Sequence, residues 1–456
     1  MRYRKADLGT AVKNDLRVEF TESGLSSYAG LELLTRYCRS IRLNDLIRRH
    51  FAGTVLGGDY GTVAMIRIML GLLIVGGRRI RHLDFVRGDV LFERFAGLIR
   101  LPSLRTLSRW LTQFTMQSVQ RLQALNAEIV ARVIRCEPLR TLSIDVDGSV
   151  VSTGHQVERA FRGFNPHHRK VPSYYPITAY LAETGQILRV KNRSGNVHDG
   201  KASITFLRDL FSQVKETIGS AYHLNFRMDG AFFHPKVLQL LTTQGAGFCI
   251  KVPFWQWLDL TGLIKARRRW KHINTQLSYF EATLTVWDVT VRVAIYRKKV
   301  FHRSRKNYQL DLFDPNDGYY EYSAIATNLS LAPRKLWNFM AGRGEHEKVI
   351  GQLRGQLAFA TVPTHRYGAN SAWQQITAIA HNLLVSFQID TGARRRNRTE
   401  KRTCLYKLKT AQTLRFELLN RAGRVVRPNG TSILRLSRNS RYRDLFTWTA
   451  QALKTA

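Results

Sequence analysis

The pattern of apolar and polar positions divides the chain into regions of different period. From about Ser26 to Arg135, apolar residues recur every three or four positions, as in the runs 64–70 and 119–125, and Gly or Pro separates the runs. That spacing gathers apolar side chains on one face of a helix. We therefore predict an all-helical N-terminal domain over residues 1–137.

One predicted helix in this region carries two basic residues. The run Leu101–Leu111 resembles the capped start of an amphipathic helix, with Arg105 and Arg109 on it. The recognition helix of a helix-turn-helix protein has such a pattern, and so does an ordinary surface helix. Both interpretations stay open, and Arg105 and Arg109 are candidate DNA contacts.

The most apolar segment does not predict a membrane protein. The run Thr62–Gly77 is interrupted by Arg67 and is shorter than the roughly 20 residues that cross a bilayer, so it predicts a buried helix. No apolar stretch follows the basic residues at the N-terminus. We expect a cytoplasmic protein and no membrane partner.

Near residue 140 the spacing of the apolar residues shortens to every second position, which is the period of a strand. Leu142, Ile144 and Val146 fall on one face of this strand, whereas Asp145 and Asp147 fall on the other. A buried charge is costly unless it is bound to something. The two aspartates are therefore candidate metal ligands.

The elements that follow predict an α/β fold. The strand-like runs 174–182 and 186–193 are joined by a turn typical of a hairpin. Further elements are predicted as a helix at 201–217, a strand that ends at Asp229, a helix from about Pro235 and a strand at 247–252. The order β-β-β-α-β-α-β is that of an RNase H-like core, whose first part we place at 138–252.

The rest of the chain is predicted in three parts. Alternation of aromatic and β-branched residues over 253–332 predicts an antiparallel β insertion. Helical patterns return over 333–390, broken near Gly342, and supply the second part of the core. Beyond Gly392 there are 17 Lys and Arg but 3 Asp and Glu, which indicates a basic C-terminal arm over 391–456.

The charge balance indicates a polyanionic partner. The chain has 71 Lys and Arg against 33 Asp and Glu, for a formal charge of +38. Nucleic acid is the leading explanation and an anionic membrane surface the second. Runs such as Arg394, Arg395 and Arg396 are then candidates for phosphate contact.

Three carboxylates have the placement that phosphodiester chemistry requires. Cleavage and joining of DNA strands use two divalent ions, one at the attacking oxygen and one at the leaving oxygen. Magnesium takes oxygen ligands, which distant parts of a chain can supply together. The candidates are Asp145 or Asp147 on a strand, Asp229 at a strand end and Glu347 on a helix. The competing interpretation is that these acids are solvated surface groups.

Several motifs over residues 140–385 resemble one known group. They are the segments 143–149, 154–156 with 163–165, 175–177 with 183–185 and 193–196, and 226–232. Through these motifs the chain resembles the DDE transposases of bacterial insertion sequences. The resemblance is to the superfamily of insertion sequence 4, and within it most closely to insertion sequence family 1380.

The resemblance implies roles for individual residues. The group's first aspartate precedes a small and then a hydroxyl residue, which favours Asp147 as the catalytic acid and leaves Asp145 as a supporting ligand. The late signature of the superfamily is Tyr-x2-Arg-x3-Glu-x6-Lys. Arg343 and Glu347 match it, Arg354 stands in place of the Lys, and Met340 stands in place of the Tyr.

The loss of that Tyr leaves Glu345 as an alternative to Glu347. Arg343, Lys348 and Arg354 are candidate DNA contacts on this helix.

The resemblance also implies an activity, a cofactor and partners. It implies a transposase that uses two Mg²⁺, with Mn²⁺ as a substitute, on double-stranded DNA. The substrates are the terminal inverted repeats of the element and a target DNA, held by a homodimer in the synaptic complex. A catalytically inactive or domesticated DNA-binding derivative and a nuclease without joining activity are the alternatives. Relatives stack a flipped base on an aromatic residue of the insertion, where four tryptophans are candidates: Trp255, Trp257, Trp270 and Trp287.

Overall fold

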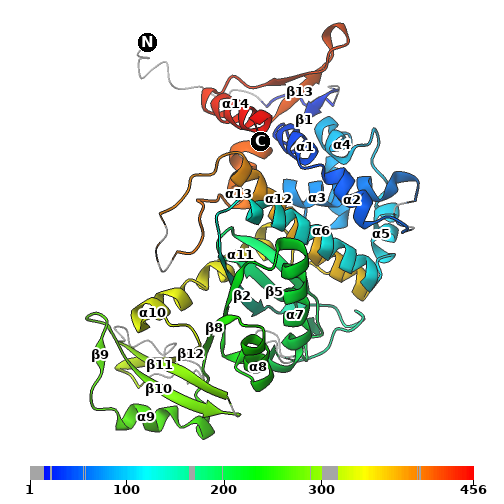
Figure 1. Cartoon of the computed structure of the whole chain (residues 1–456). Coiled ribbons are helices and arrows are strands. Elements are labelled where there is room, and N and C mark those ends of the chain that lie inside the picture. The colour runs from blue at the N-terminus through cyan, green and yellow to red at the C-terminus, as the bar shows by residue number, and fades with distance from the viewer. Residues whose placement is uncertain are drawn as a thin grey trace, which may run out of the picture.

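The structure is a computed structural model of the chain. It describes residues 15–20, 23–54, 56, 58–163, 170–197, 199–287, 289–299, 317–397, 399 and 402–455. Helices and strands gather into a mixed α/β molecule with one large sheet (Figure 1).

The large sheet has nine strands in the order β6-β5-β2-β7-β8-β12-β11-β10-β9. Strand β2 runs parallel to β7, and β7 runs parallel to β8, while the other neighbours are antiparallel. The strands, in chain order, are β2 (Thr141–Gly148), β5 (Ile177–Leu181), β6 (Gln186–Lys191), β7 (His223–Met228), β8 (Gly247–Lys251), β9 (Lys271–His272), β10 (Leu277–Val286), β11 (Val289–Lys299) and β12 (Tyr320–Thr327).

The predicted alternation of β2 is confirmed, and it gives this strand two different faces. Leu142, Ile144 and Val146 are fully buried in one hydrophobic core with residues of helices α6 (Met116–Arg135) and α7 (Asp199–Gln213). The aspartates of β2 lie on the opposite face. The predicted hairpin of β5 and β6, the strand β7 and the helix α8 (Pro235–Thr243) are also observed.

The N-terminal region consists mostly of helices but also contains the short strand β1 (Leu25–Ser26), and its core is shared with later parts of the chain. The helices before α6 are α1 (Leu31–Ser40), α2 (Leu43–His50), α3 (Gly61–Val75), α4 (Val90–Ala96) and α5 (Leu104–Thr112). Helix α12 (Tyr367–Asp390) packs into the same core, and nearly all of its side chains are buried. A helix that is buried all round needs neighbours on every side, so this helical end of the molecule is built from both halves of the chain.

The predicted buried helix is α3. Residues 58–75 form the one segment, among the described residues, that is long and apolar enough to cross a membrane by length and composition, and 61% of it is buried inside the protein. Every residue from Ala64 to Val75 is buried. Helix α3 is therefore a core helix of the fold.

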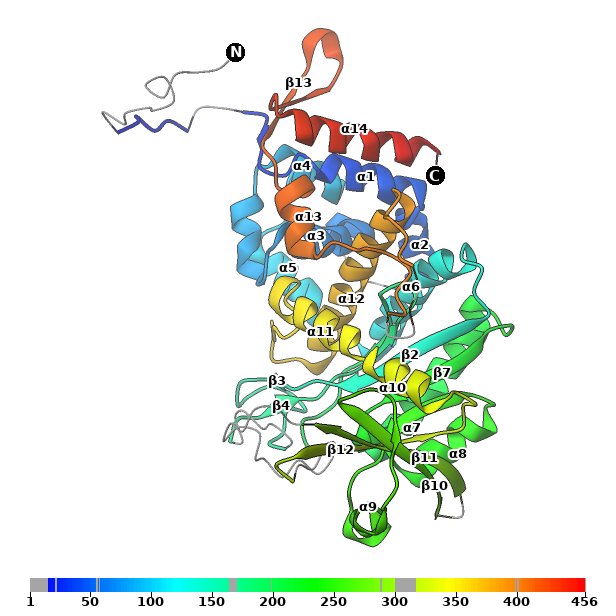
Figure 2. The same cartoon turned by 90° about the vertical axis from the view of Figure 1, so that its left-hand side faces the viewer.

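The insertion does not form a sheet of its own. Strands β10, β11 and β12 are antiparallel as predicted, with helix α9 (Leu260–Ala266) before them. Strand β12 pairs with β8, so the insertion extends the sheet that contains β2 and β7. Helices α10 (Pro333–Ala341) and α11 (Gly344–Gln356) then follow one another across the sheet (Figure 2), with the predicted break between them.

The C-terminal segment is folded, in contrast to the arm expected from its charge. It contains α13 (Ala411–Leu414), β13 (Gly423–Val426), β14 (Ile433–Leu436) and α14 (Ser440–Thr455), and β13 pairs with the short strand β1 (Leu25–Ser26). Leu418, Leu419 and Tyr442 are buried in the helical core. The count of basic residues concealed these apolar positions. A small two-stranded sheet, β3 (Val151–Ser152) with β4 (Ser173–Tyr174), completes the fold.

Candidate active site

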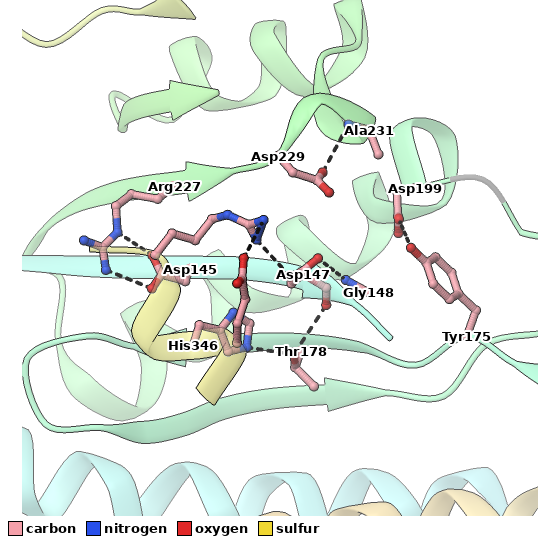
Figure 3. A network of polar contacts seen from close by, with 12 residues as sticks. Asp145, Asp147, Gly148, Tyr175, Thr178, Asp199, Arg227, Asp229, Ala231 and His346 are labelled. Carbon is pink, nitrogen blue, oxygen red and sulfur yellow. Dashed lines mark hydrogen bonds and ion pairs between the residues drawn. The ribbon is translucent and has the colours of Figure 1, made fainter. Parts of the chain in front are cut away.

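The register of two parallel strands brings two of the predicted acids together. In the β2–β7 pair, Asp145 is opposite Arg227 and Val146 is opposite Met228. One further step along both chains places Asp147 beside Asp229, on the same face of the sheet as Asp145. Asp147 and Asp229 lie at the ends of neighbouring strands and border the same space (Figure 3).

Backbone amides fix the direction of both carboxylates. Asp147 Oδ1 accepts a hydrogen bond from the Gly148 amide at 2.9 Å. Asp229 Oδ1 accepts one from the Ala231 amide at 3.1 Å and caps the short helical turn that follows β7. The two acids are therefore held in place by local structure at each strand end.

The break between α10 and α11 supplies the third acid and a cation. Arg343 Nη1 donates to Asp147 Oδ2 at 2.8 Å, and Arg343 Nη2 lies 3.2 Å from Glu347 Oε1. The Arg343 side chain is 13% exposed, while that of Glu347 is 60% exposed. Glu345 pairs instead with Lys348 at 3.3 Å. The geometry thus favours Glu347 over Glu345.

A fourth acid, Asp199, borders the site and was not predicted. Tyr175 donates its hydroxyl to Asp199 Oδ2 at 2.7 Å, and Arg193 Nη2 donates to Asp199 Oδ1 at 2.5 Å. Asp199 stands in the first turn of α7, where a helix favours an acid. That position was the available sequence signal, but it also fits an ordinary helix start.

Burial and the neighbouring acids disfavour the charged forms of the carboxylates at the site. Burial, with the charges of Asp229, Asp199 and Glu347, raises the pKa of Asp147 to about 7, although Arg343 opposes the shift. The pKa of Asp229 is also raised, first by burial and then by Asp199, against the effect of Arg343. The arginine therefore balances part of the charge of several carboxylates, and the site has the electrostatics of one that binds a further cation.

Asp145, which was predicted as a supporting metal ligand, is paired with an arginine. Arg227 donates from Nε to Asp145 Oδ1, and from Nη2 to Oδ2 at 2.8 Å. Both side chains are 0% exposed. Because a bidentate arginine occupies both carboxylate oxygens, the geometry assigns Asp145 to an ion pair and leaves Asp147 as the acid at the site.

The donor types at the site fit a divalent cation. Three carboxylates supply hard oxygen ligands, which magnesium prefers. Within the described part of the chain, however, no three Asp, Glu, His or Cys side chains are grouped closely enough to hold a metal ion. Arg343 provides the positive charge that bridges Asp147 and Glu347 in this arrangement.

The remaining predicted basic residues are spread over the molecule. Arg354 is exposed on α11, and Arg105 and Arg109 are exposed on α5, whose predicted cap is confirmed because Ser103 accepts from the Thr106 amide.

In the C-terminal segment Arg394 is exposed and Arg396 partly so. Arg395 donates to Glu137 at 2.6 Å. Of all the predicted DNA contacts, Arg343 alone bonds to the candidate catalytic acids.

Three of the four candidate tryptophans are packed in the core that joins the insertion to the sheet. Trp255, Trp270 and Trp287 pack against that core, whereas Trp257 is 56% exposed. Trp257 stacks on Trp255 with a centroid distance of 5.6 Å. Trp257 is thus the most accessible of the four.

The fold and the site define the class: a mixed α/β protein with acids gathered at the carboxyl ends of parallel strands, beside an acid from a later helix. The chain belongs to the family described as "Transposase DDE domain group 1", whose model matches residues 9–456. No curated protein matches the chain.

One solved structure similar to this chain is described as the piggyBac transposase synaptic complex with hairpin DNA. The two chains share 10% identity, with 94% of this chain and 81% of that chain covered, at a TM-score of 0.44.

Proposed function

We propose that this protein is a DNA transposase that cleaves DNA strands at the terminal inverted repeats of an insertion sequence and joins them to a target. The observation that carries the proposal is the meeting of Asp147, Asp229 and Glu347 around Arg343 in a member of a DDE transposase family. Family 1380 of the insertion sequences remains the assignment that the sequence motifs favour.

The sheet supports an RNase H-like catalytic core. In such a core, an antiparallel hairpin lies on one side of the first strand, and the later strands lie on the other side of the first strand and run parallel to it. The strands in the order β6-β5-β2-β7-β8 run in these directions, and helices follow β6 and β7. In this proposal Asp147 is the acid of the central strand, and Asp229 is the acid that directly follows its parallel neighbour.

Asp147, Asp229 and Glu347 would hold the divalent ions, with Mg²⁺ as the expected cofactor and Mn²⁺ as a substitute. When bound, the ions supply activation of the attacking oxygen and stabilisation of the leaving oxygen. Arg343 orients Asp147 and Glu347 through its two guanidinium nitrogens. Its planar fork also suits phosphate oxygens, so it is placed to bind the DNA backbone next to the acids.

The basic surface would hold double-stranded DNA outside the site. Arg354, Lys348, Arg105, Arg109 and Arg394–Arg396 are the proposed phosphate contacts, and the net charge of +38 supports them. Because transposition joins two ends of one element, we expect two copies of the chain in the synaptic complex.

The test is cleavage of a duplex that carries the terminal inverted repeat, with Mg²⁺ or Mn²⁺ and a supercoiled target plasmid. Wild type is compared with Asp147→Asn, Asp229→Asn and Glu347→Gln, and Glu345→Gln serves as the matched control on the same helix. We expect the first three variants to bind DNA without cutting it and the control to cut normally. Loss of cutting in Glu345→Gln alone would transfer the catalytic role to Glu345.

A second candidate is a DNA-binding protein without catalysis. It is favoured by the position of Arg343 among the acids and by the lack, among the described residues, of a grouped set of three metal ligands. Wild-type protein that binds the repeat but leaves it uncut with either ion would establish this function. Cut ends that never enter the plasmid would instead indicate a nuclease.

A further inference from the structure

The guanidinium of Arg227 joins several separate parts of the fold behind the site. Besides its two bonds to Asp145, Nη1 donates to the Phe339 carbonyl at 2.9 Å and to Thr403 Oγ1 at 3.2 Å. The guanidinium carbon also lies 4.9 Å from the centroid of the Phe339 ring. One buried cation thus connects β2, β7, the end of α10 and the C-terminal segment.

The break between α10 and α11 rests directly on this guanidinium. A Cβ atom added to Gly342 would come within 2.3 Å of Arg227 Nη1. Gly342 has φ −60° and ψ −21°, a helical conformation that any residue adopts without strain. This position therefore requires glycine for a steric reason: the Arg227 guanidinium occupies the space that a Cβ atom would need.

The residues after Gly342 are those that complete the site. Arg343 is next in the chain and Glu347 follows one helical turn later, and the two side chains contact each other. A shift of Gly342 would move both of them relative to Asp147, because α11 begins directly after the break. Asp145 and Asp147 are two residues apart on β2, so the same strand carries the anchor of Arg227 and the first acid.

We propose that Arg227, fixed by Asp145, is a positioning residue that sets where Arg343 and Glu347 stand relative to Asp147 and Asp229. This inference rests on the proposed function, since it concerns the arrangement of the same acids. Arg227 touches neither DNA nor metal in this role and acts through the backbone at Phe339 and Gly342.

A structural role alone predicts a different result from a positioning role. If the Asp145–Arg227 pair only stabilises the fold, a variant that stays folded keeps its activity and its metal affinity. If the pair positions the break, a small displacement reduces both without unfolding the protein. Misplacement by about 1 Å can cost about 100-fold in rate, and changes behind a ligand cost about 10- to 100-fold in metal affinity.

The matched variants are Gly342→Ala and Gly344→Ala. Gly342 has a helical backbone conformation, and Gly344 is the first residue of α11. In contrast to Gly342, an added Cβ atom at Gly344 meets no atom within 4 Å. The measurements are the melting temperature, Mn²⁺ affinity by electron paramagnetic resonance, the Kd for the inverted repeat, and the single-turnover cleavage rate at saturating DNA.

For Gly342→Ala we expect a folded protein with about 100-fold slower cleavage and about 10-fold weaker Mn²⁺ binding, and a Kd for DNA changed at most severalfold, because Arg343 is one of several proposed phosphate contacts. Gly344→Ala should match wild type in all four measurements. Equal cleavage rates and equal Mn²⁺ affinities in the two folded variants would overturn the proposal.

Arg227→Lys provides a second test if Gly342→Ala does not fold. It keeps a buried positive charge near Asp145 but lacks the planar fork that reaches Asp145 and Phe339 together. We expect the same two losses, and a folded Arg227→Lys with wild-type rate and Mn²⁺ affinity would refute the positioning role. A wild-type protein that binds no Mn²⁺ and cuts no DNA would contradict the proposed function itself, which is a separate outcome.

Discussion

Two neighbouring cross-strand pairs on one face of the sheet have opposite electrostatic character. Asp145 and Arg227 form a fully buried ion pair with no exposed side-chain surface. Two residues further along the chain at each position, Asp147 and Asp229 border the same space (Figure 3), and Arg343 reaches Asp147 from another element. The first pair is closed and balanced, while the second is open and carries excess negative charge.

The comparison shows that the two aspartates of the Asp-Val-Asp segment have separate tasks. An arginine on the partner strand removes Asp145 from contact with solvent or ions. Asp147 lies instead beside another acid, and burial, with the charges of Asp229, Asp199 and Glu347, raises its pKa to about 7 although Arg343 opposes the shift. The two aspartates of β2 therefore differ because of the residues beside them: Arg227 on β7 lies opposite Asp145, and Asp229, just beyond the end of β7, lies beside Asp147.

The largest effect is expected from removing charge at the open pair. Asp147→Asn should reduce strand cleavage by about 10⁴-fold, because a bound metal supplies several kcal/mol of transition-state stabilisation. It should not lower the free energy of unfolding measured with urea, since burial and the charges of Asp229 and Asp199 disfavour the charged form of Asp147 by more than Arg343 favours it. A large loss of stability in Asp147→Asn would contradict the contrast between the two pairs.

Removing one partner at the closed pair should instead cost stability. Arg227→Met leaves the Asp145 carboxylate buried and unpaired, and we expect a loss of about 3–5 kcal/mol in the free energy of unfolding. The double variant Asp145→Leu with Arg227→Met should recover most of this loss. Urea denaturation of the two variants and wild type gives the comparison, and equal instability of the single and double variants would show that the charge is not the cause.

A buried acid next to β2 should make stability depend on pH. Both oxygens of Glu183 accept from the Ser143 amide, and burial raises the pKa of Glu183 to about 7, above its ordinary value of about 4.5. The folded state therefore holds a proton that the unfolded state releases first. Its contribution is fully present below pH 4.5 and is lost as the pH rises towards 7, up to roughly 3 kcal/mol.

Glu183→Gln should flatten this part of the stability profile, measured by urea denaturation from pH 4 to pH 8. The exposed residue Glu216 provides the control, because Glu216→Gln should leave the profile unchanged. A profile that keeps its slope in Glu183→Gln would assign the pH dependence to other groups.

The smallest effect is expected far from both pairs, on the basic surface. Arg394 is exposed, so Arg394→Gln should weaken DNA binding severalfold and reduce the slope of log K against log salt by about 0.9. Arg395 is paired with Glu137, and Arg395→Gln should change the slope less. Fluorescence anisotropy across a salt series measures both, and identical slopes in the two variants would argue against a special role for Arg394.

The sequence predicted most of the elements, because each carries a local periodic signal. The alternation of β2, the hairpin of β5 and β6 and the break before Arg343 are observed, and the strand predicted to end at Asp229 ends one residue earlier, at Met228. The C-terminal segment was misjudged as an arm because its charge count outweighed Leu418, Leu419 and Tyr442. The pairing of β12 with β8 was not visible, since it joins strands about 75 residues apart.

The sequence by itself determined the acidic residues and the faces on which they lie, because the period of a strand or helix fixes direction. It also determined the basic character of the chain. Only the tertiary structure decided that Asp145 binds Arg227, that Asp199 joins the site and that Gly342 rests against a guanidinium. The physical reason is that register between distant strands and contacts between distant segments depend on packing across the whole sheet, which no local pattern records.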